Sequence, residues 1–299
     1  MTSPHDRPFR FGLCVFTPST RAEWVAKVRA AEELGYDVIS VSDHLGMPAP
    51  IPTLLLAAEA TERIRIGTLV FNTAFYHPTV LARDLATVDR YSGGRVELGL
   101  GAGYDRAQFD AAGIPFPAAG ERVSQLERTV AEFRKPRAEL EPYARFEQPG
   151  GPPILIAGRG PRLLKLAAAH ADIIAFTGTT EVRDGDGLKL GGITEVTDRI
   201  EYVRGLLGDR INQVEFNIPV HKVLPKGATD GVTDVWQNRL DLTPAELEEL
   251  PSLLFGTPEE NADTLRERRK TLGLTYYTVL EPEMESFAPI IQEIRRTAP

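Results

Sequence analysis

The sequence predicts an α/β protein folded as an eight-stranded (β/α)8 TIM barrel, with insertions in the loops that follow the strands. Eight short apolar segments alternate with segments of helical periodicity, and this alternation continues along the whole chain. The length of 299 residues suits one large barrel, since such barrels run to about 250 residues as one unit. We therefore expect residues 1–299 to form a single domain.

The expected strands are short and rich in aliphatic and aromatic residues. They are Phe9–Phe16, Asp37–Val41, Ile64–Val70, Arg95–Leu100, Pro153–Ala157, Asp172–Phe176, Val214–Val220 and Thr275–Leu280. The first four are almost evenly spaced, and wide gaps follow residues 100, 180 and 221. We expect these gaps to hold insertions in βα loops, which build the active face of a barrel.

The expected helices carry apolar residues at helical spacing. They are Thr20–Leu34, His77–Tyr91, a helix through Val123–Phe133, Pro161–His170, Thr194–Leu207, a helix from Pro258 to about Leu272, and Phe287–Arg296. Gly35 is placed to end the first helix. Thr257-Pro258-Glu259-Glu260 supplies a capping Thr, a Pro at the first helical position and a Glu two residues later. The proline-rich segment Arg137–Pro153 is expected to be an irregular loop.

Composition and charge exclude several classes of protein. The net charge is −8, and the densest basic segments, Arg266–Lys270 and Arg295–Arg296, stand among acidic residues, so we expect no nucleic-acid partner. The longest apolar stretches, such as Leu54–Ala58, are too short to span a membrane. Met1–Arg10 lacks an apolar signal core, so a cytoplasmic protein is expected. One cysteine, Cys14, excludes an internal disulfide, and no metal-binding spacing is present.

The candidate chemistry lies just past the ends of the expected strands, where barrel enzymes place their active sites. The second strand ends in Asp43-His44, a pair that can polarise a substrate or donate a proton near neutral pH. The alternative is an Asp that caps the next loop and a His on the polar surface. Cys14 lies within the first strand, where packing is the more common role, although its side chain can face the pocket.

Two glycine-rich strand ends are the other candidates. Gly99-x-Gly101-x-Gly103 would let the backbone approach a flat ring or a phosphate, but it is not a dinucleotide fingerprint, and a tight turn explains it equally well. Ala157-Gly158-Arg159-Gly160-Pro161 leads into a helix, so its free N–H groups and its guanidinium suit an anion. A plain βα turn is the alternative there.

Four motifs in order along the chain resemble the luciferase-like flavin and deazaflavin oxidoreductases. They are Ser42-Asp43-His44, Gly67-Thr68-Leu69-Val70 followed by Tyr76-His77-Pro78, the run from Ser92 to Gly103, and the run from Pro152 to Arg162. The most similar branch uses the deazaflavin coenzyme F420.

The resemblance implies a non-prolyl cis peptide at Leu69–Val70 that bulges against the cofactor ring, and it places Asp43 and His44 beside the redox carbon. It implies that two loops, with Thr177-Gly178, hold the cofactor side chain and phosphate. The implied cofactor-binding residues are Leu69, Val70, Gly101, Ala102, Gly103, Tyr104, Ala157, Gly158, Arg159, Gly160 and Thr177.

The sequence also departs from the family pattern. The first strand ends in Cys14-Val15-Phe16-Thr17 without the carboxylate that the sugar-phosphate dehydrogenase branch carries there, and no matching basic set is visible. The segment 134–151 is short for the family. These departures concern the substrate and not the fold.

The expected function is F420-dependent hydride transfer to or from a small organic substrate, with reduction of a C=C or C=N bond favoured. His44, with Asp43 behind it, is the expected proton donor or polarising group. The expected pocket residues are Cys14, Phe71, Phe75 and Phe176. One alternative is an FMN-dependent monooxygenase served by a partner reductase. Another is a non-catalytic flavin-binding subunit. A homodimer is left open.

Overall fold

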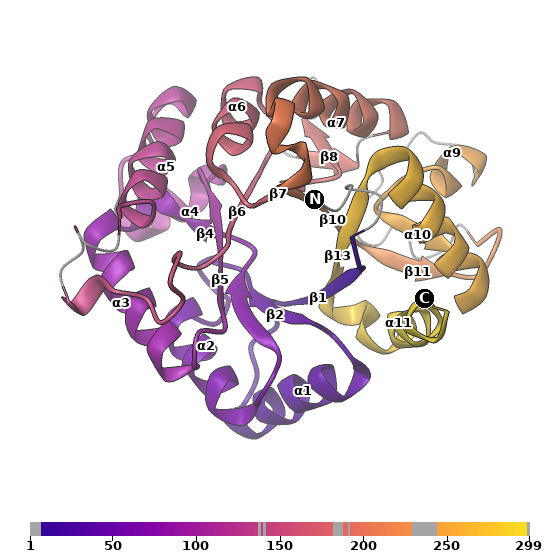
Figure 1. Ribbon diagram of the computed structural model, residues 1–299, viewed down its shortest axis with the longest axis horizontal. Helices are drawn as coiled ribbons and strands as arrows, with labels where there is room; N and C mark the ends of the chain where they lie inside the picture. The colour runs from indigo at the N-terminus through magenta and orange to yellow at the C-terminus, as the bar shows by residue number, and fades with distance from the viewer. Residues whose placement is uncertain are drawn as a thin grey trace.

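The computed structural model describes residues 7–136, 139, 142–181, 188–190, 192–228 and 244–297. Eight parallel strands form a closed barrel, and helices form a ring around it (Figure 1). The barrel strands are β1 (Arg10–Val15), β2 (Val38–Val41), β3 (Arg65–Thr68), β5 (Val96–Gly101), β6 (Ile154–Gly158), β7 (Ile173–Phe176), β10 (Glu215–Val220) and β13 (Leu274–Leu280). The barrel is closed because β13 pairs with β1 from Arg10–Tyr276 to Cys14–Leu280. The expected TIM barrel is confirmed.

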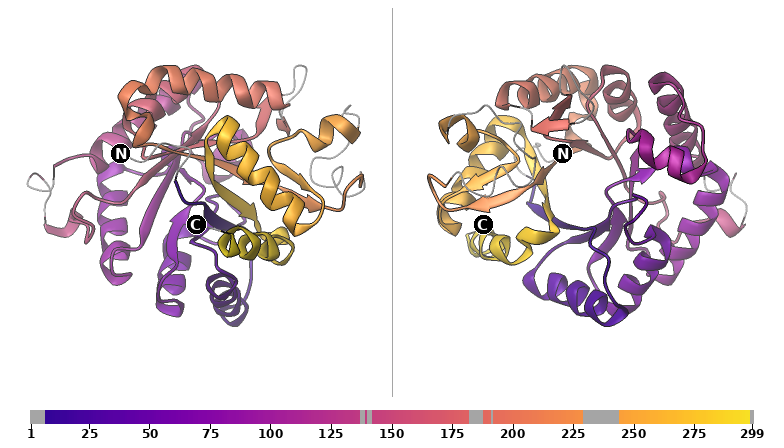
Figure 2. Two further views of the ribbon diagram at one scale, coloured as in Figure 1. Left: turned by 45° about the vertical axis from the view of Figure 1, so that its right-hand side comes forward. Right: turned by 180° about the vertical axis from the view of Figure 1, so that it is seen from behind.

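The outer ring is seen from its other end in the right-hand view of Figure 2. Its helices are α1 (Arg21–Leu34), α2 (Pro50–Ala60), α3 (Pro78–Tyr91), α5 (Ala119–Phe133), α6 (Pro161–His170), α7 (Ile193–Leu207), α10 (Pro258–Leu272) and α11 (Met284–Arg296). The caps of α1 and α10 form as expected, with Thr20 and Thr257 each in a capping box and Gly35 left-handed at φ 91°.

The insertions occupy the three expected gaps. Short elements fill them: α4 (Arg106–Ala112) after β5, the antiparallel pair β8 (Thr179–Glu181) and β9 (Leu188–Leu190) after β7, and β11 (Lys222–Leu224), α9 (Pro244–Glu248) and β12 (Leu253–Phe255) after β10. The sequence analysis did not predict α2 or α4. Helix α2 is apolar on nearly every side, so it shows no helical periodicity.

Part of the segment expected to be a proline-rich loop, residues 137–138 and 140–141, lies outside the described residues. The remainder holds only the short 3-10 helix η4 (Pro142–Ala144), as an irregular loop would.

Alternate residues of each strand face different cores. The larger core lies between strands and helices, and β7 contributes Ile174 and Phe176 to it. Ile173 and Ala175 of the same strand belong to a smaller cluster on the opposite face, which is the barrel interior. Half-buried Leu69, Val70 and Ala157 pack against this interior cluster.

An ion-pair network fills the interior at the end where the strands begin. Arg10 lies 2.5 Å from Glu97 Oε2 and 2.6 Å from Glu215 Oε2 through its two Nη atoms. The Tyr276 hydroxyl donates to Glu97 Oε1 at 2.9 Å. Burial alone lowers the pKa of Arg10, but the two carboxylates raise it above its ordinary value. The network therefore joins β1, β5, β10 and β13 at the floor of the barrel.

Candidate active site

The third barrel strand is interrupted at the end where active sites form. The expected strand Ile64–Val70 stops at Thr68, and the chain resumes as β4 (Phe71–Asn72) after a non-prolyl cis peptide at Leu69–Val70. The cis peptide that the resemblance implied is confirmed. The interruption is tied to β2, because Leu69 N donates to Val41 O at 3.0 Å and Ser42 Oγ donates to Leu69 O at 3.2 Å.

The glycines of β5 make room for this interruption. A Cβ on Gly99 would lie 1.8 Å from the Thr68 carbonyl oxygen, and one on Gly101 would lie 2.6 Å from a methyl carbon of Val70. The close approach of two backbones therefore requires the Gly99-x-Gly101 spacing, a reason that the sequence analysis did not foresee.

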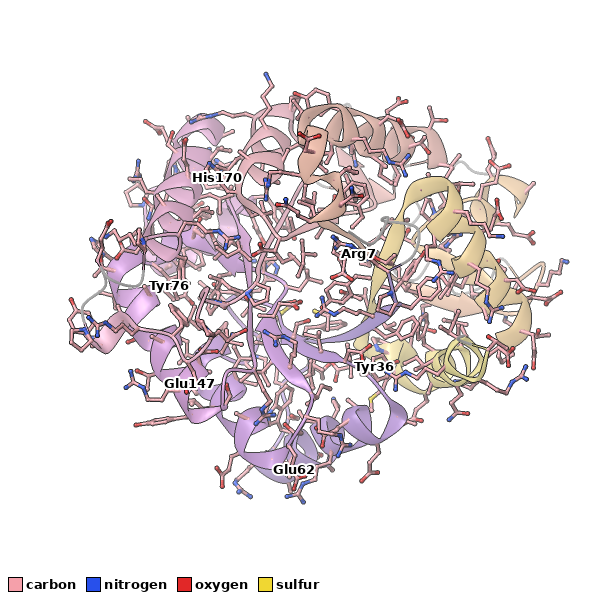
Figure 3. All side chains as sticks on the ribbon, viewed as in Figure 1. Arg7, Tyr36, Glu62, Tyr76, Glu147 and His170 are labelled. Carbon is pink, nitrogen blue, oxygen red and sulfur yellow. The ribbon has the colours of Figure 1, made fainter. Side chains whose placement is uncertain are left out.

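Asp43 holds the segment that follows β4. Its Oδ2 accepts from Asn72 N at 3.0 Å, and its Oδ1 accepts from the Tyr76 hydroxyl at 3.2 Å; Tyr76 is labelled in Figure 3. Burial raises the pKa of Asp43 above its ordinary value, and the two hydrogen bonds act in the opposite direction. Asp43 thus fixes the geometry beside the Leu69–Val70 peptide.

The hydrogen-bond partner of His44 is Gln108 of α4, not Asp43 as expected. The two side chains meet at 2.5 Å between Gln108 Nε2 and His44 Nδ1. The Tyr104 ring packs edge-on to the imidazole, with ring centroids 6.0 Å apart. The sequence analysis missed Gln108, although Asp105-x-x-Gln108 has the spacing of a helix N-cap and its third position. Asp105 does cap α4, because its Oδ1 accepts from Ala107 N at 3.0 Å.

Positive charge gathers beside the ends of β6 and β7. Gly160 is the N-cap residue of α6 and makes no side-chain hydrogen bond to the helix. Backbone N–H groups in the first turn of α6 therefore lack a capping side chain. Arg159 lies close enough to act on two groups: it lowers the pKa of Arg199, after the larger effect of burial, and it opposes the burial that raises the pKa of Tyr104. Arg199 of α7 was not predicted; it donates to Thr179 O at 2.7 Å.

The predicted substrate-pocket residues do not form one wall. Phe71 and Phe176 are both 0% exposed and belong to the core that faces the helices, so their inclusion in the pocket is wrong. Phe75 packs against Phe109, with ring centroids 4.9 Å apart. Cys14 faces the interior but is 2% exposed, with Sγ 3.4 Å from Ser42 Oγ.

Comparison with known proteins places this site in a family. Residues 8–185 match the sequence model of the luciferase-like monooxygenases. The chain belongs to the luciferase-like monooxygenase family. The family region runs from β1 past β7 and therefore contains the cis peptide, Asp43, His44 and Arg159.

The curated relatives match about half of the chain. An F420-dependent glucose-6-phosphate dehydrogenase from Nakamurella multipartita is 32% identical over 197 residues, which are 58% of this chain and 56% of that protein. A 5,10-methylenetetrahydromethanopterin reductase from Archaeoglobus fulgidus is 29% identical over 153 residues, 48% of this chain and 46% of the other. The chain thus spans about half the length of these relatives.

The fold comparison extends over nearly the whole chain. The coenzyme F420-dependent tetrahydromethanopterin reductase from Methanopyrus kandleri superposes with a TM-score of 0.69 at 18% sequence identity, covering 97% of this chain and 99% of that one. At this identity the match establishes the shared fold. In the part of the chain that the structure describes, no helix is long and apolar enough to cross a membrane. The same part contains no group of three or more His, Cys, Asp or Glu side chains that could hold a metal ion.

Proposed function

We propose that the chain is an oxidoreductase that uses coenzyme F420 to transfer a hydride to or from a small organic substrate. The observation that carries the proposal is the pairing of the half-buried apolar side chains of Leu69 and Val70 with the positive charge at Arg159 and Arg199, in a chain that has F420-dependent dehydrogenases among its relatives. A flat ring with a phosphate-bearing side chain needs an apolar platform and an anion site, and this end of the barrel offers both.

The residues present fit such a cofactor. Leu69 and Val70 are half-buried apolar side chains of the barrel interior, at the end of the barrel where the strands finish, and a ring would rest on them. Arg159, Arg199 and the uncapped start of α6 favour a phosphate, because guanidinium groups and a helix N-terminus both attract anions. The loop from Gly101 to Tyr104, with Ala157, Gly158, Gly160 and Thr177, completes the proposed cofactor site. When bound, F420 supplies or accepts the hydride.

Two side chains of the protein act on the substrate or its surroundings: one donates a hydrogen bond or proton, and the other fixes the neighbouring backbone. His44 offers its ring as hydrogen-bond or proton donor at the atom that gains charge, and Asp43 holds the neighbouring backbone through Asn72 and Tyr76. We expect His44→Ala to keep cofactor affinity within a few-fold and to lower turnover by about 10²–10⁴, the usual contribution of a general acid or base. A wild-type single-turnover rate in this variant would remove His44 from the mechanism.

A titration with F420 and with FMN, followed by absorbance, tests the cofactor directly. We expect F420 to bind and Arg159→Ala or Arg199→Ala to weaken binding by roughly 1.5–3 kcal/mol, the value of a hydrogen bond to a charged group. Arg63→Ala is the matched control, because Arg63 precedes β3 at the opposite end of the barrel and its side chain is 72% exposed. Equal affinity in all three variants would refute the anion site.

Two alternatives are outcomes of the same titration. Binding of FMN without F420 would support an FMN-dependent monooxygenase that takes its reduced cofactor from a partner reductase. Binding of F420 without any turnover would support a non-catalytic subunit. The proposal also includes a single domain over residues 1–299, a cytoplasmic location and a small-molecule substrate, and sedimentation analysis would decide whether the enzyme is a homodimer.

A further inference from the structure

The side chain of Gln108 contacts three groups of different hydrogen-bonding character. Its Oε1 accepts from the backbone N–H of Leu45 at 3.1 Å. Its Nε2 donates to Asp105 Oδ2 at 2.8 Å, and the same nitrogen lies 2.5 Å from His44 Nδ1. Gln108 therefore connects α4 to the loop that follows β2.

These contacts allow only one orientation of the Gln108 amide. The Leu45 N–H is solely a donor, so the atom facing it must be the amide oxygen. The Asp105 carboxylate is solely an acceptor, so the atom facing it must be the NH2 group. A flipped amide would place two donors against each other at Leu45 and two acceptors against each other at Asp105.

The amide orientation decides the state of the His44 ring. One hydrogen of Nε2 is used by Asp105, and the other points to His44 Nδ1, which must accept it. We infer that Gln108 is a positioning residue that holds neutral His44 as the tautomer with its proton on Nε2. Among the residues that the structure describes, none forms a hydrogen bond with that Nε2–H group, so it remains available to a substrate.

This inference rests on the proposed function and makes it more specific. His44 then acts as a hydrogen-bond donor that polarises the substrate. If the ring gave its Nε2 proton to the substrate, Nδ1 would have to gain a proton, and that proton would point at the N–H group of the Gln108 amide. An Nε2–H donor recognises an acceptor atom. The substrate class that fits is an unsaturated compound whose reducible C=C bond is conjugated to a carbonyl oxygen. The hydride adds to the far carbon of that bond, the electron pair moves to the oxygen that the Nε2–H group binds, and water supplies the proton that completes the reduction.

Nitrogen-15 NMR of the histidine rings in the cofactor-free protein tests the inference. The two neutral tautomers give different shifts at Nδ1 and Nε2, and the signals of His44 are identified by their loss in His44→Gln. We expect the Nε2–H pattern at neutral pH. The pattern of the Nδ1–H tautomer, or of a doubly protonated ring, would overturn the inference.

Two variants test whether Gln108 is the cause. Gln108→Glu replaces the donor with an acceptor and should convert His44 to a ring with a proton on Nδ1. Gln108→Met removes the donor at similar size and should make both tautomers detectable, and it serves if the Glu variant does not fold. Ala111→Glu is the matched control, because it adds the same charge to the exposed face of α4 and should leave the wild-type pattern.

An unchanged His44 spectrum in folded Gln108→Glu and Gln108→Met would refute the role of Gln108. Because these spectra need no cofactor, that failure is distinct from a failure of the F420 titration, which would refute the proposed function alone.

Discussion

Gly99→Ala should be among the most damaging single-methyl additions in this protein. The new Cβ would lie 1.8 Å from the Thr68 carbonyl oxygen, whereas real Cβ contacts stay above 3.0 Å, so one of the two strands must move by roughly 1.2 Å. The obstacle is backbone and cannot rotate away. We expect a loss of about 3 kcal/mol in the free energy of unfolding, the upper end of the cost of overpacking.

Two further glycines make this a graded test. Gly101→Ala meets only a methyl group of Val70, at 2.6 Å, so we expect about 1–2 kcal/mol, together with weaker cofactor binding because Val70 must shift. Gly205→Ala is the control: Gly205 is exposed on α7 with no atom within 4 Å of the added Cβ, and alanine should stabilise the helix by about 0.5–1 kcal/mol. Urea unfolding followed by circular dichroism measures all three. Equal stability of Gly99→Ala and the wild type would refute the steric argument.

Three other predictions concern buried groups. Glu97→Gln removes one of two carboxylates from Arg10 and should cost about 3 kcal/mol of unfolding free energy, as for a broken buried ion pair, and a change near zero in urea unfolding would contradict this. Burial lowers the pKa of His221 from 6.5 to about 4, so between these two pH values the imidazole is protonated in the unfolded chain and neutral in the folded chain. Stability should therefore fall by about 2 kcal/mol from pH 8 to pH 5, and His221→Gln should remove that part of the pH dependence. Burial also raises the pKa of the Cys14 thiol, so alkylation by iodoacetamide should be slow in the native protein and fast in urea, and equal rates would count against it.

The barrel could be predicted because its signals are local. Each strand is a short apolar run, and helices such as Pro161–His170 and Pro258–Leu272 begin at prolines and caps that the sequence displays. The helix Pro50–Ala60 was missed for a physical reason: it has apolar residues on most sides, so the alternation of polar and apolar faces is absent.

The site was harder to predict because its contacts join distant segments. Asp43 and His44 follow a strand and were visible as candidates, but the partner of the imidazole is 64 residues away at Gln108. The charge that Arg199 adds beside Arg159 likewise depends on how α7 lies against the loop after β6. Phe176 was wrongly predicted to line the pocket, because the sequence of a strand shows that successive side chains alternate between two faces but not which face is the barrel interior.

The ion-pair network at the barrel floor limits which segments can be exchanged between this protein and related barrels. Arg10 binds Glu97 in the first half of the chain and Glu215 in the second, so neither half carries the complete set of charges. A chimera that joins residues 8–185 of this protein to the second half of a related barrel must therefore inherit a carboxylate at the start of its seventh strand. Exchanges confined to the loops beyond the carboxyl ends of the strands leave all of these charges in place, which makes those loops the natural units for grafting new substrate specificity.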